Sequence, residues 1–253
     1  MWLRTLILLT LAISAFGMSA KNKYGIHLEK KVEICKNMKA DIVLIIDGSN
    51  SIGETKFDQQ IEFLKSFVGY FAIGKNDVRF GAVTFGNKVI MGNTFGLSQY
   101  TNKNRLEERV SQINFRQDDG SSTQTNLAIK YARETLFKDT RHYAKKIAIV
   151  ITDGESTDSL KTKEEASEMR KDGIVILAIG VGKNASKEEL LTITGKENYV
   201  FEIDEYSKLK TIKKELTKLA CKGMYILIIL YSYHLKILYY VFIILYSYIL
   251  MFL

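Results

Sequence analysis

The sequence predicts an α/β fold with a doubly wound, mostly parallel central sheet that carries helices on both faces, a Rossmann-like arrangement. Short apolar runs rich in β-branched residues alternate along the chain with longer segments whose apolar residues recur at helical spacing. The segments 42–46, 145–152 and 174–179 contain continuous apolar stretches, as expected for strands buried on both faces. Strands that alternate with helices are joined by right-handed crossovers, and these place the helices on the two faces.

Each predicted element follows from the spacing of its apolar residues and from the residues that end it. The predicted strands cover residues 42–46, 78–85, 88–91, 145–152, 174–179 and 199–203. The predicted helices cover residues 54–71, a short segment around 106–113, 125–137, 161–171, a segment that starts at Ser186, and 206–220. The strand at 88–91 depends on the Gly86-Asn87 turn, which is typical of a hairpin. Ser186 with Glu189 three residues later is a capping-box pattern, and it places a helix start there.

Composition is that of a globular protein with one domain plus extensions. The chain has 253 residues, of which 47% are hydrophobic and 25% are charged. Its formal net charge is +8, but the lysines are scattered along the sequence rather than grouped in blocks. There is no zinc-finger spacing and no aromatic-basic RNA-binding motif, so we do not expect nucleic-acid binding.

The two ends of the chain differ from the middle. Residues 1–20 have the positive start, apolar core and small residues of a secretory signal, although a buried N-terminal helix is an alternative. Residues 21–34 are predicted to form an N-terminal extension, and the folded domain is predicted to occupy residues 35–221. Residues 224–253 are almost wholly apolar and long enough to span a bilayer, but Lys236 would lie in the hydrocarbon at a cost of roughly 2.5–3.5 kcal/mol.

Three interpretations of the tail therefore stay open: a membrane anchor, a removed lipid-anchor signal, and a non-native extension of the reading frame. The signal at the amino end predicts an exported protein in each case. We expect a secreted, extracellular protein, with a membrane-anchored form that holds its domain outside the cell as the alternative.

Two cysteines, Cys35 and Cys221, bracket the predicted domain. In an oxidising compartment such a pair would form a disulfide that joins the two ends of the domain, whereas in a reducing compartment both would be free thiols. Asn184 begins an Asn-Ala-Ser sequon and is a candidate for N-glycosylation, which applies only to an exported chain.

Side chains with oxygen donors follow the central strands at the points where those strands end. Asp47, Ser49 and Ser51 follow the first strand, Thr123 precedes a predicted helix, and Asp153 follows a second central strand. Ligands bind at the carboxyl ends of strands in open α/β sheets. Oxygen donors suit Mg²⁺, Mn²⁺ or Ca²⁺ better than zinc. Taken singly, Ser51 and Thr123 would more often cap helices, and an Asp-Gly pair is usually a turn; their joint occurrence favours a metal site.

Three segments carry a resemblance to a known family: DIVLIIDGSNSI, STQTNLAIKYA and IAIVITDGES. In this order they are similar to von Willebrand factor type A domains, above all to the inserted domains of collagen-binding integrins and to matrilin-like and collagen-type extracellular relatives. The resemblance covers about residues 35–221. It implies a metal-ion-dependent adhesion site in which Ser49 and Ser51 bind Mg²⁺ or Mn²⁺ directly through their hydroxyls. It also implies that Thr123 binds directly or through water, and that Asp47 and Asp153 act largely through bridging waters.

The resemblance further implies that the metal binds a Glu or Asp side chain of another protein. Asn50 and Glu155 match positions that touch the ligand in collagen-binding relatives, so both are candidate contacts. We therefore expect an adhesion module that binds a matrix or cell-surface protein, collagen-like or other. The segment 182–190 is short, and the extra helix of collagen-binding integrin domains is missing there, which leaves collagen itself open as a ligand. A metal-independent structural module of the matrix is the alternative.

Enzymatic activity is not expected. A phosphatase or hydrolase that used Asp47 would need a second Asp two residues later, and that position is Ser49. The histidines of the expected mature chain, His27, His142 and His234, lie outside the three motifs. The run Gly180-Val181-Gly182-Lys183 resembles a phosphate loop, but Asn184 follows where Ser or Thr would bind magnesium.

Overall fold

The computed structural model describes residues 35, 38–116 and 122–221. The chain divides into two compact units, residues 1–33 and residues 34–253, and every described residue belongs to the second. The predicted signal (1–20), extension (21–34) and apolar tail (224–253) lie outside the described residues and stay predictions. Within the described part, no helix is long and apolar enough to cross a membrane.

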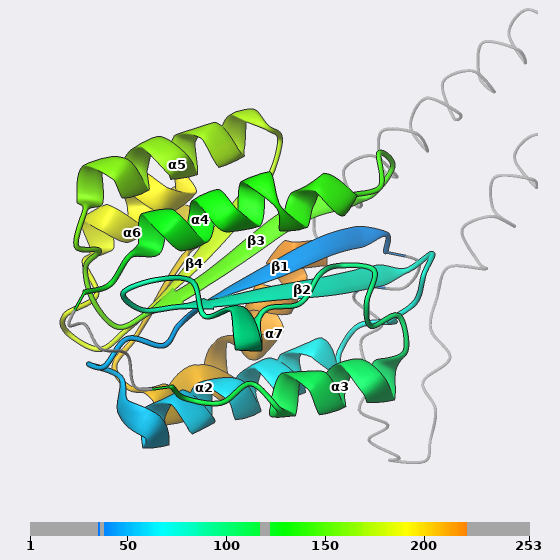
Figure 1. The fold of residues 1–253 in the computed structure, drawn as a ribbon, viewed down its shortest axis with the longest axis horizontal. Coiled ribbons are helices and arrows are strands. Elements are labelled where there is room, and N and C mark those ends of the chain that lie inside the picture. Colours follow the sequence, from blue (N-terminus) through cyan, green and yellow to red (C-terminus); the bar gives the residue numbers. More distant parts are fainter. Residues whose placement is uncertain (1–34, 36–37, 117–121, 222–253) are drawn as a thin grey trace, which may run out of the picture. The chain divides into compact units, whose positions relative to one another are not determined.

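The central sheet has five strands, all parallel, in the order β2-β1-β3-β4-β5, which confirms the predicted fold class (Figure 1). The strands are β1 (Ala40–Asp47), β2 (Val78–Phe85), β3 (Lys145–Thr152), β4 (Val175–Val181) and β5 (Val200–Ile203). The helices are α2 (Gly53–Val68), α3 (Lys103–Ser111), α4 (Thr125–Glu134), α5 (Ser159–Lys171), α6 (Lys187–Thr194) and α7 (Leu209–Cys221). Short 3-10 turns are η1 (Met91–Asn93), η2 (Leu136–Asp139), η3 (Glu197–Tyr199) and η4 (Tyr206–Lys208).

Helices cover both faces of the sheet, and the alternation of side chains along each strand explains how (Figure 1). In β1, Ile42, Leu44 and Ile46 belong to the hydrophobic cluster that also contains the buried faces of α2, α3 and α7. Val43 and Ile45 point to the opposite face, where they join the cluster formed with α4, α5 and α6. Because both faces are apolar, β1 is fully buried along its whole length.

The direction of chain crossover reverses between β1 and β3. From β1 the chain passes through α2 to β2 on one side, and it later returns past β1 to β3 on the other side. Such a reversal leaves a crevice at the carboxyl ends of the two strands, where open α/β sheets bind their ligands. Ile46 lies beside Ile151 in the ladder, so the ends of β1 and β3 meet at this point.

The strand predicted at 88–91 is wrong. This segment pairs with β2 at a single position, the antiparallel bridge between Phe85 and Val89, and the chain then enters the 3-10 turn η1. It returns to pair once more where Phe95 lies opposite Ala82. Two isolated pairings do not build a ladder, so β2 stays the edge strand and a loop covers its free side.

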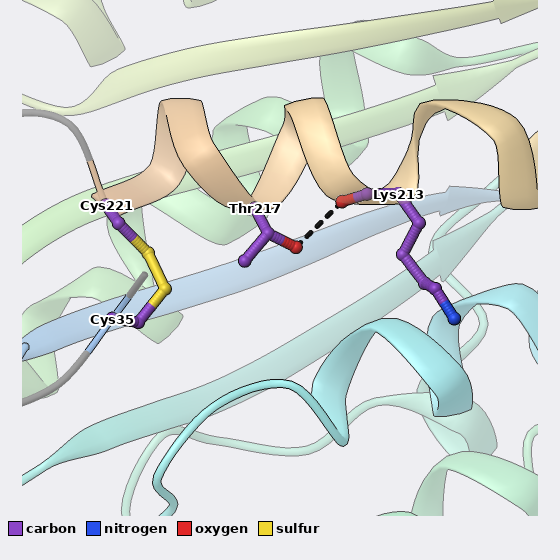
Figure 2. Close-up of a disulfide and its surroundings, with 4 residues drawn as sticks. All are labelled: Cys35, Lys213, Thr217 and Cys221. Atoms are coloured by element: carbon purple, nitrogen blue, oxygen red, sulfur yellow. Dashed lines mark hydrogen bonds between the residues drawn. A yellow bond between two sulfur atoms is a disulfide. The ribbon is translucent and has the colours of Figure 1, made fainter. Parts of the chain in front are cut away.

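A disulfide joins Cys35 to Cys221, with 5.5 Å between their Cα atoms and 186 residues between them in sequence. The predicted pairing is confirmed, and Figure 2 shows that it ties the end of α7 to the segment that leads into β1. One turn earlier on α7, the hydroxyl of Thr217 donates a 2.7 Å hydrogen bond to the backbone carbonyl of Lys213. The last helix is therefore fixed at its far end by a covalent bond.

Asp41 lies at the start of β1 and is completely buried, yet it is charged and satisfied. Arg79 donates from Nε over 2.8 Å to its carboxylate, and Arg141 donates from its backbone amide over 2.8 Å and from Nη2 over 2.7 Å. Burial by itself would raise the pKa of Asp41, but the hydrogen bonds from the two arginines outweigh burial and lower this pKa. No local pattern in the sequence signals this network, which holds β1, β2 and the loop before β3 together.

Removing the disulfide should lower stability substantially. Replacing both cysteines by serine (Cys35→Ser with Cys221→Ser) should reduce the free energy of unfolding by about 5 kcal/mol, because so long a loop restricts the unfolded chain strongly. Urea unfolding with and without dithiothreitol measures the effect. Reductant should bring the wild type close to the double variant and leave that variant unchanged; a wild type that is insensitive to reductant would contradict the prediction.

Replacing Asp41 by asparagine should destabilise the fold by about 3 kcal/mol at pH 7, because two buried guanidinium groups lose their counter-charge. The folded pKa of Asp41 lies below its unfolded value of about 3.9, so its contribution is complete above that pH and is lost as the pH falls through the folded pKa. Urea unfolding at neutral and at acidic pH should show the gap between wild type and variant narrowing below about pH 4. Asp204→Asn is the control: it removes an exposed ion pair with Lys208, and its urea midpoint should match that of the wild type.

Candidate metal centre

The centre begins at the end of β1 with Asp47, whose side chain is completely buried. Its Oδ1 accepts a 2.9 Å hydrogen bond from the backbone amide of Ser49, and its Oδ2 accepts a 2.6 Å bond from the hydroxyl of Thr152 at the end of β3. Residue 48 is a glycine whose surroundings leave little room for a side chain. A Cβ on Gly48 would approach the side chain of Thr84 to 3.0 Å and the ring of Phe57 to 3.2 Å. Asp47 is thus fixed in orientation by both central strands.

The hydroxyls of the turn lead from this buried carboxylate to the surface. Ser49 Oγ lies 3.0 Å from Ser51 Oγ, and Ser51 in turn donates to Asp153 Oδ1 over 3.1 Å. Ser51 was alternatively interpreted as a helix cap, but α2 is capped at Ile52 without any side-chain hydrogen bond. The two hydroxyls and the two carboxylates therefore converge on one another across the β1–β3 crevice.

Thr123 is joined to the same region through its backbone. Its amide donates to the hydroxyl of Thr157 over 2.8 Å, and the amide of Thr157 donates back to the carbonyl of Thr123 over 2.9 Å. The alternative that Thr123 caps α4 is also wrong, since the N-cap is Gln124 and has no side-chain bond. Among the described residues, its hydroxyl has no hydrogen bond to the other four candidates, and the contacts of Thr123 with this region run through Thr157 in the loop after β3.

Glu189 of α6 holds the loop that carries Asp153. Its carboxylate accepts from the backbone amide of Ser156 at 3.0 and 3.2 Å and from the hydroxyl of Ser156 at 2.8 Å. The capping box predicted at Ser186 is therefore half correct: Ser186 Oγ accepts from the amide of Glu189, whereas the Glu189 carboxylate turns away to the loop after β3. The sequence pattern identified Glu189 as part of a helix start, but it gave no indication that Ser156 is the partner of its carboxylate.

The two carboxylates of the centre lie in surroundings that disfavour negative charge. Burial raises the pKa of Asp47 to about 6, partly offset by hydrogen bonds from Thr152 and Ser49, and the charge of Asp153 raises it further. Burial also raises the pKa of Asp153, against the lowering effects of Ser51 and Lys56. A positive charge placed among these oxygens would offset the cost of ionising both groups.

Two buried polar residues lie beneath the centre and were missed by the sequence analysis. Gln60 of α2 is fully buried and donates a 2.9 Å bond to the backbone carbonyl of Asp47. It occupies the apolar face of its helix, three residues after Phe57, and a polar residue there was the available signal. Tyr206 of η4 is also buried; burial raises its pKa, as do the charges of Asp153 and Asp47, so the phenol stays neutral.

The remaining candidates lie on the surface around the centre. Asn50 and Glu155 are exposed and flank the cluster in sequence, and Asn184 is exposed in the turn between β4 and α6. The glycine run beside Asn184 has a packing explanation, because a Cβ on Gly180 would collide with the side chain of Leu190 and meet Ala185 at 2.9 Å. This finding gives the run a structural purpose without any phosphate.

Chemically, the centre is a set of oxygen donors without nitrogen or sulfur. In the described part of the chain, no group of three or more His, Cys, Asp or Glu side chains gathers to hold a metal, so the set depends on hydroxyls as much as on carboxylates. Mixed hydroxyl and carboxylate oxygens fit a hard divalent cation. The fold and the centre together define a doubly wound α/β domain with an oxygen-lined site at its switch point.

Comparison with known proteins identifies the family. Residues 41–215 match the family model of the von Willebrand factor type A domain, and the chain belongs to this family. A collagen alpha-1(XXI) chain of Xenopus laevis is 32% identical over 190 residues, which cover 74% of this chain and 19% of that one. A collagen alpha-4(VI) chain of Mus musculus is 36% identical over 192 residues, covering 76% of this chain and 8% of that one.

A solved structure also resembles this domain. Proximal thread matrix protein 1 from the mussel byssus, with a zinc-occupied MIDAS motif, has a TM-score of 0.67 and 31% identity, and the match covers 73% of this chain and 46% of that one. The chain spans a fifth or less of the two collagen relatives and under half of this protein. The family is thus shown, while the activities of the longer relatives are not transferred with it.

Glu189→Gln should loosen the loop after β3. An uncharged amide accepts weaker hydrogen bonds than a carboxylate, so the backbone amide of Ser156 should exchange with solvent about tenfold faster. Amide hydrogen exchange followed by NMR measures this directly. The neighbouring exposed Glu188→Gln is the matched control and should leave exchange at Ser156 unchanged; equal exchange in both variants would show that Glu189 does not hold the loop.

Proposed function

We propose that this domain is an extracellular adhesion module that binds an acidic side chain of a matrix or cell-surface protein through Mg²⁺ or Mn²⁺. The observation that carries the proposal is the convergence of Ser49, Ser51 and Asp153 in one chain of hydrogen bonds at the β1–β3 crevice. Asp47 accepts a hydrogen bond from the amide of Ser49, and Thr123 is bound to Thr157 in the loop that follows Asp153. These five residues would hold the metal.

The state of each donor supports a division of roles. Both oxygens of Asp47 already accept hydrogen bonds from protein groups, so this residue orients the turn and acts on the metal through water. Ser49 and Ser51 cap no helix, and their hydroxyls are available as direct ligands. A cation bound directly by uncharged hydroxyls keeps much of its charge, and it therefore attracts a carboxylate from a partner.

The position of the centre suits a partner protein. Ser51 and Glu155 are exposed, and so is Asn50, which lies between the two serines in sequence. We propose Asn50 and Glu155 as contacts to the partner. The collagen relatives and the zinc-occupied MIDAS motif of the mussel protein support a matrix setting and a divalent metal, with Mg²⁺ or Mn²⁺ preferred here for the oxygen donors.

Export is part of the same proposal. A disulfide fits an oxidising compartment, which supports a secreted protein or one anchored with its domain outside the cell. Asn184 is exposed, as a glycosylation site must be. We further propose that the domain is not an enzyme: His142 packs against Tyr143 near the amino end of β3, with 5.1 Å between ring centroids, and so lies far from the centre.

Ser49→Ala should weaken metal binding without unfolding the domain, because it removes one hydroxyl while the backbone amide of residue 49 still donates to Asp47 and holds the turn. We expect Mn²⁺ affinity, measured by isothermal titration calorimetry, to fall roughly tenfold or more. Ser98→Ala changes an exposed serine outside the cluster and is the control.

The same variants should be tested for partner binding on immobilised collagen and other matrix proteins, in Mg²⁺ and in EDTA. Binding should need the metal and should be lost with Ser49→Ala. Equal binding in Mg²⁺ and EDTA would remove the metal mechanism and favour the metal-independent structural module instead.

A further inference from the structure

A group of lysines lies at the amino ends of the parallel strands, at the opposite end of the sheet from the metal centre. Lys39 precedes β1, Lys75 precedes β2, Lys138 lies in η2, and Lys145 and Lys146 begin β3. Within the described ranges, none of the five forms an ion pair. Burial lowers the pKa of Lys145 with no carboxylate to oppose it. The scattered lysines of the sequence thus become neighbours through the fold.

Contacts between these residues show that they form one surface. The Nζ of Lys39 lies 5.2 Å from the ring centroid of Tyr143, and the Cζ of Arg141 lies 5.6 Å from the same centroid. Arg141 also donates over 3.0 Å to the backbone carbonyl of Lys75, and the amide of Lys145 donates over 3.0 Å to the carbonyl of Lys39. Tyr143 is 51% exposed, so this group faces solvent.

The surface continues around η2. Lys138 and Lys146 line the same open hollow of about 370 Å³, together with Phe137 and Ile174. We call the set Lys39, Lys75, Lys138, Arg141, Lys145 and Lys146 the basic edge. Its residues come from the segments that precede or begin β1, β2 and β3, from η2, and from the loop between η2 and β3.

Several acids near the basic edge form ion pairs with arginines. Asp41 lies between Arg79 and Arg141, and Asp139 lies 3.8 Å from Arg79. Arg133, which also lines the hollow, lies 2.9 Å from Glu134, 2.9 Å from Glu165 and 3.9 Å from Asp172. A further carboxylate, that of Asp77, lies against Gly74. The lysines are left as the uncompensated charge of this edge.

We propose that the basic edge binds a sulfated polysaccharide. Four of the six side chains of the basic edge lie within residues 138–146, KDTRHYAKK, and the fold adds Lys39 and Lys75 beside them. Lysines are flexible point charges, which suits sulfate groups spaced along a linear chain. Nucleic acid is disfavoured because Tyr143, an exposed aromatic residue of this edge, already has two cations over its ring and offers no free platform for base stacking.

The two sites are far enough apart to work independently. Lys39 and Asp47 stand at opposite ends of β1, which at about 3.3 Å per residue separates them by roughly 25 Å. A polysaccharide on the basic edge leaves the metal centre free for a protein partner. The inference therefore does not depend on the proposed metal function, and EDTA should not affect it.

The test is binding of the full chain to immobilised heparin, measured by surface plasmon resonance at about 0.15 M salt in the presence of EDTA. The triple variant Lys39→Gln, Lys75→Gln, Lys138→Gln removes three exposed charges from the basic edge. We expect its affinity to fall at least tenfold, with a shallower dependence on salt concentration. The matched control is Lys88→Gln, Lys163→Gln, Lys183→Gln, which removes three exposed, unpaired lysines elsewhere and should change affinity less than threefold.

Thermal melting of both triple variants, expected to match the wild type, separates lost binding from lost folding. Equal losses in the two variants would mean that net charge alone drives binding and would overturn the proposal, as would wild-type affinity in the basic-edge variant. Single-stranded DNA and vesicles containing phosphatidylserine serve as competing polyanions. If either binds the basic edge more tightly than heparin does, the assignment to a sulfated polysaccharide is wrong.

Discussion

The parallel pairing of β1 with β3 is the constraint on which the rest of the structure depends. Because this register sets Ile46 beside Ile151, the next residues of the two strands meet at the sheet edge, and Thr152 can donate to Asp47. The same pairing reverses the direction of crossover and opens the crevice. A slip of one residue would turn Asp47 toward the opposite face and bring α2 against the wrong side chains. The register of β1 against β3 therefore determines both the packing of the helices and the geometry of the site.

The two ends of β1 solve opposite electrostatic problems. At the amino end, Asp41 is buried but receives hydrogen bonds from two guanidinium groups, which lower its pKa. At the carboxyl end, Asp47 is buried with only neutral donors around it, and burial raises its pKa to about 6. One carboxylate is satisfied entirely by the protein and has a structural role. The other has no positively charged hydrogen-bond donor among the described residues, which agrees with its proposed place at a metal site.

Local patterns were enough to predict most of the fold and the oxygen donors. Continuous apolar runs located β1 and β3, and Asp47, Ser49, Ser51 and Asp153 could be placed together because parallel strands end at the same edge. The prediction of a strand at 88–91 was wrong because a turn signal shows where a chain reverses but not how many residues then pair. The carboxylate of Glu189 was assigned to its own helix, since a long-range partner such as Ser156 leaves no periodic signal in the sequence.

The basic edge was not predicted from the sequence either, and the reason is again that its residues are brought together by long-range contacts. In a doubly wound sheet, a whole strand and a helix separate the first residue of one strand from the first residue of the next. Residues that lie together at the amino ends of neighbouring strands are therefore far apart in sequence. Lys39, Lys75 and Lys145 are spread over more than one hundred positions, and a charge count along the chain finds them scattered. Only the strand order brings them together. A parallel sheet thus brings distant segments together at both ends of its strands. Here the carboxyl ends carry the oxygen donors, and the amino ends carry positive charge.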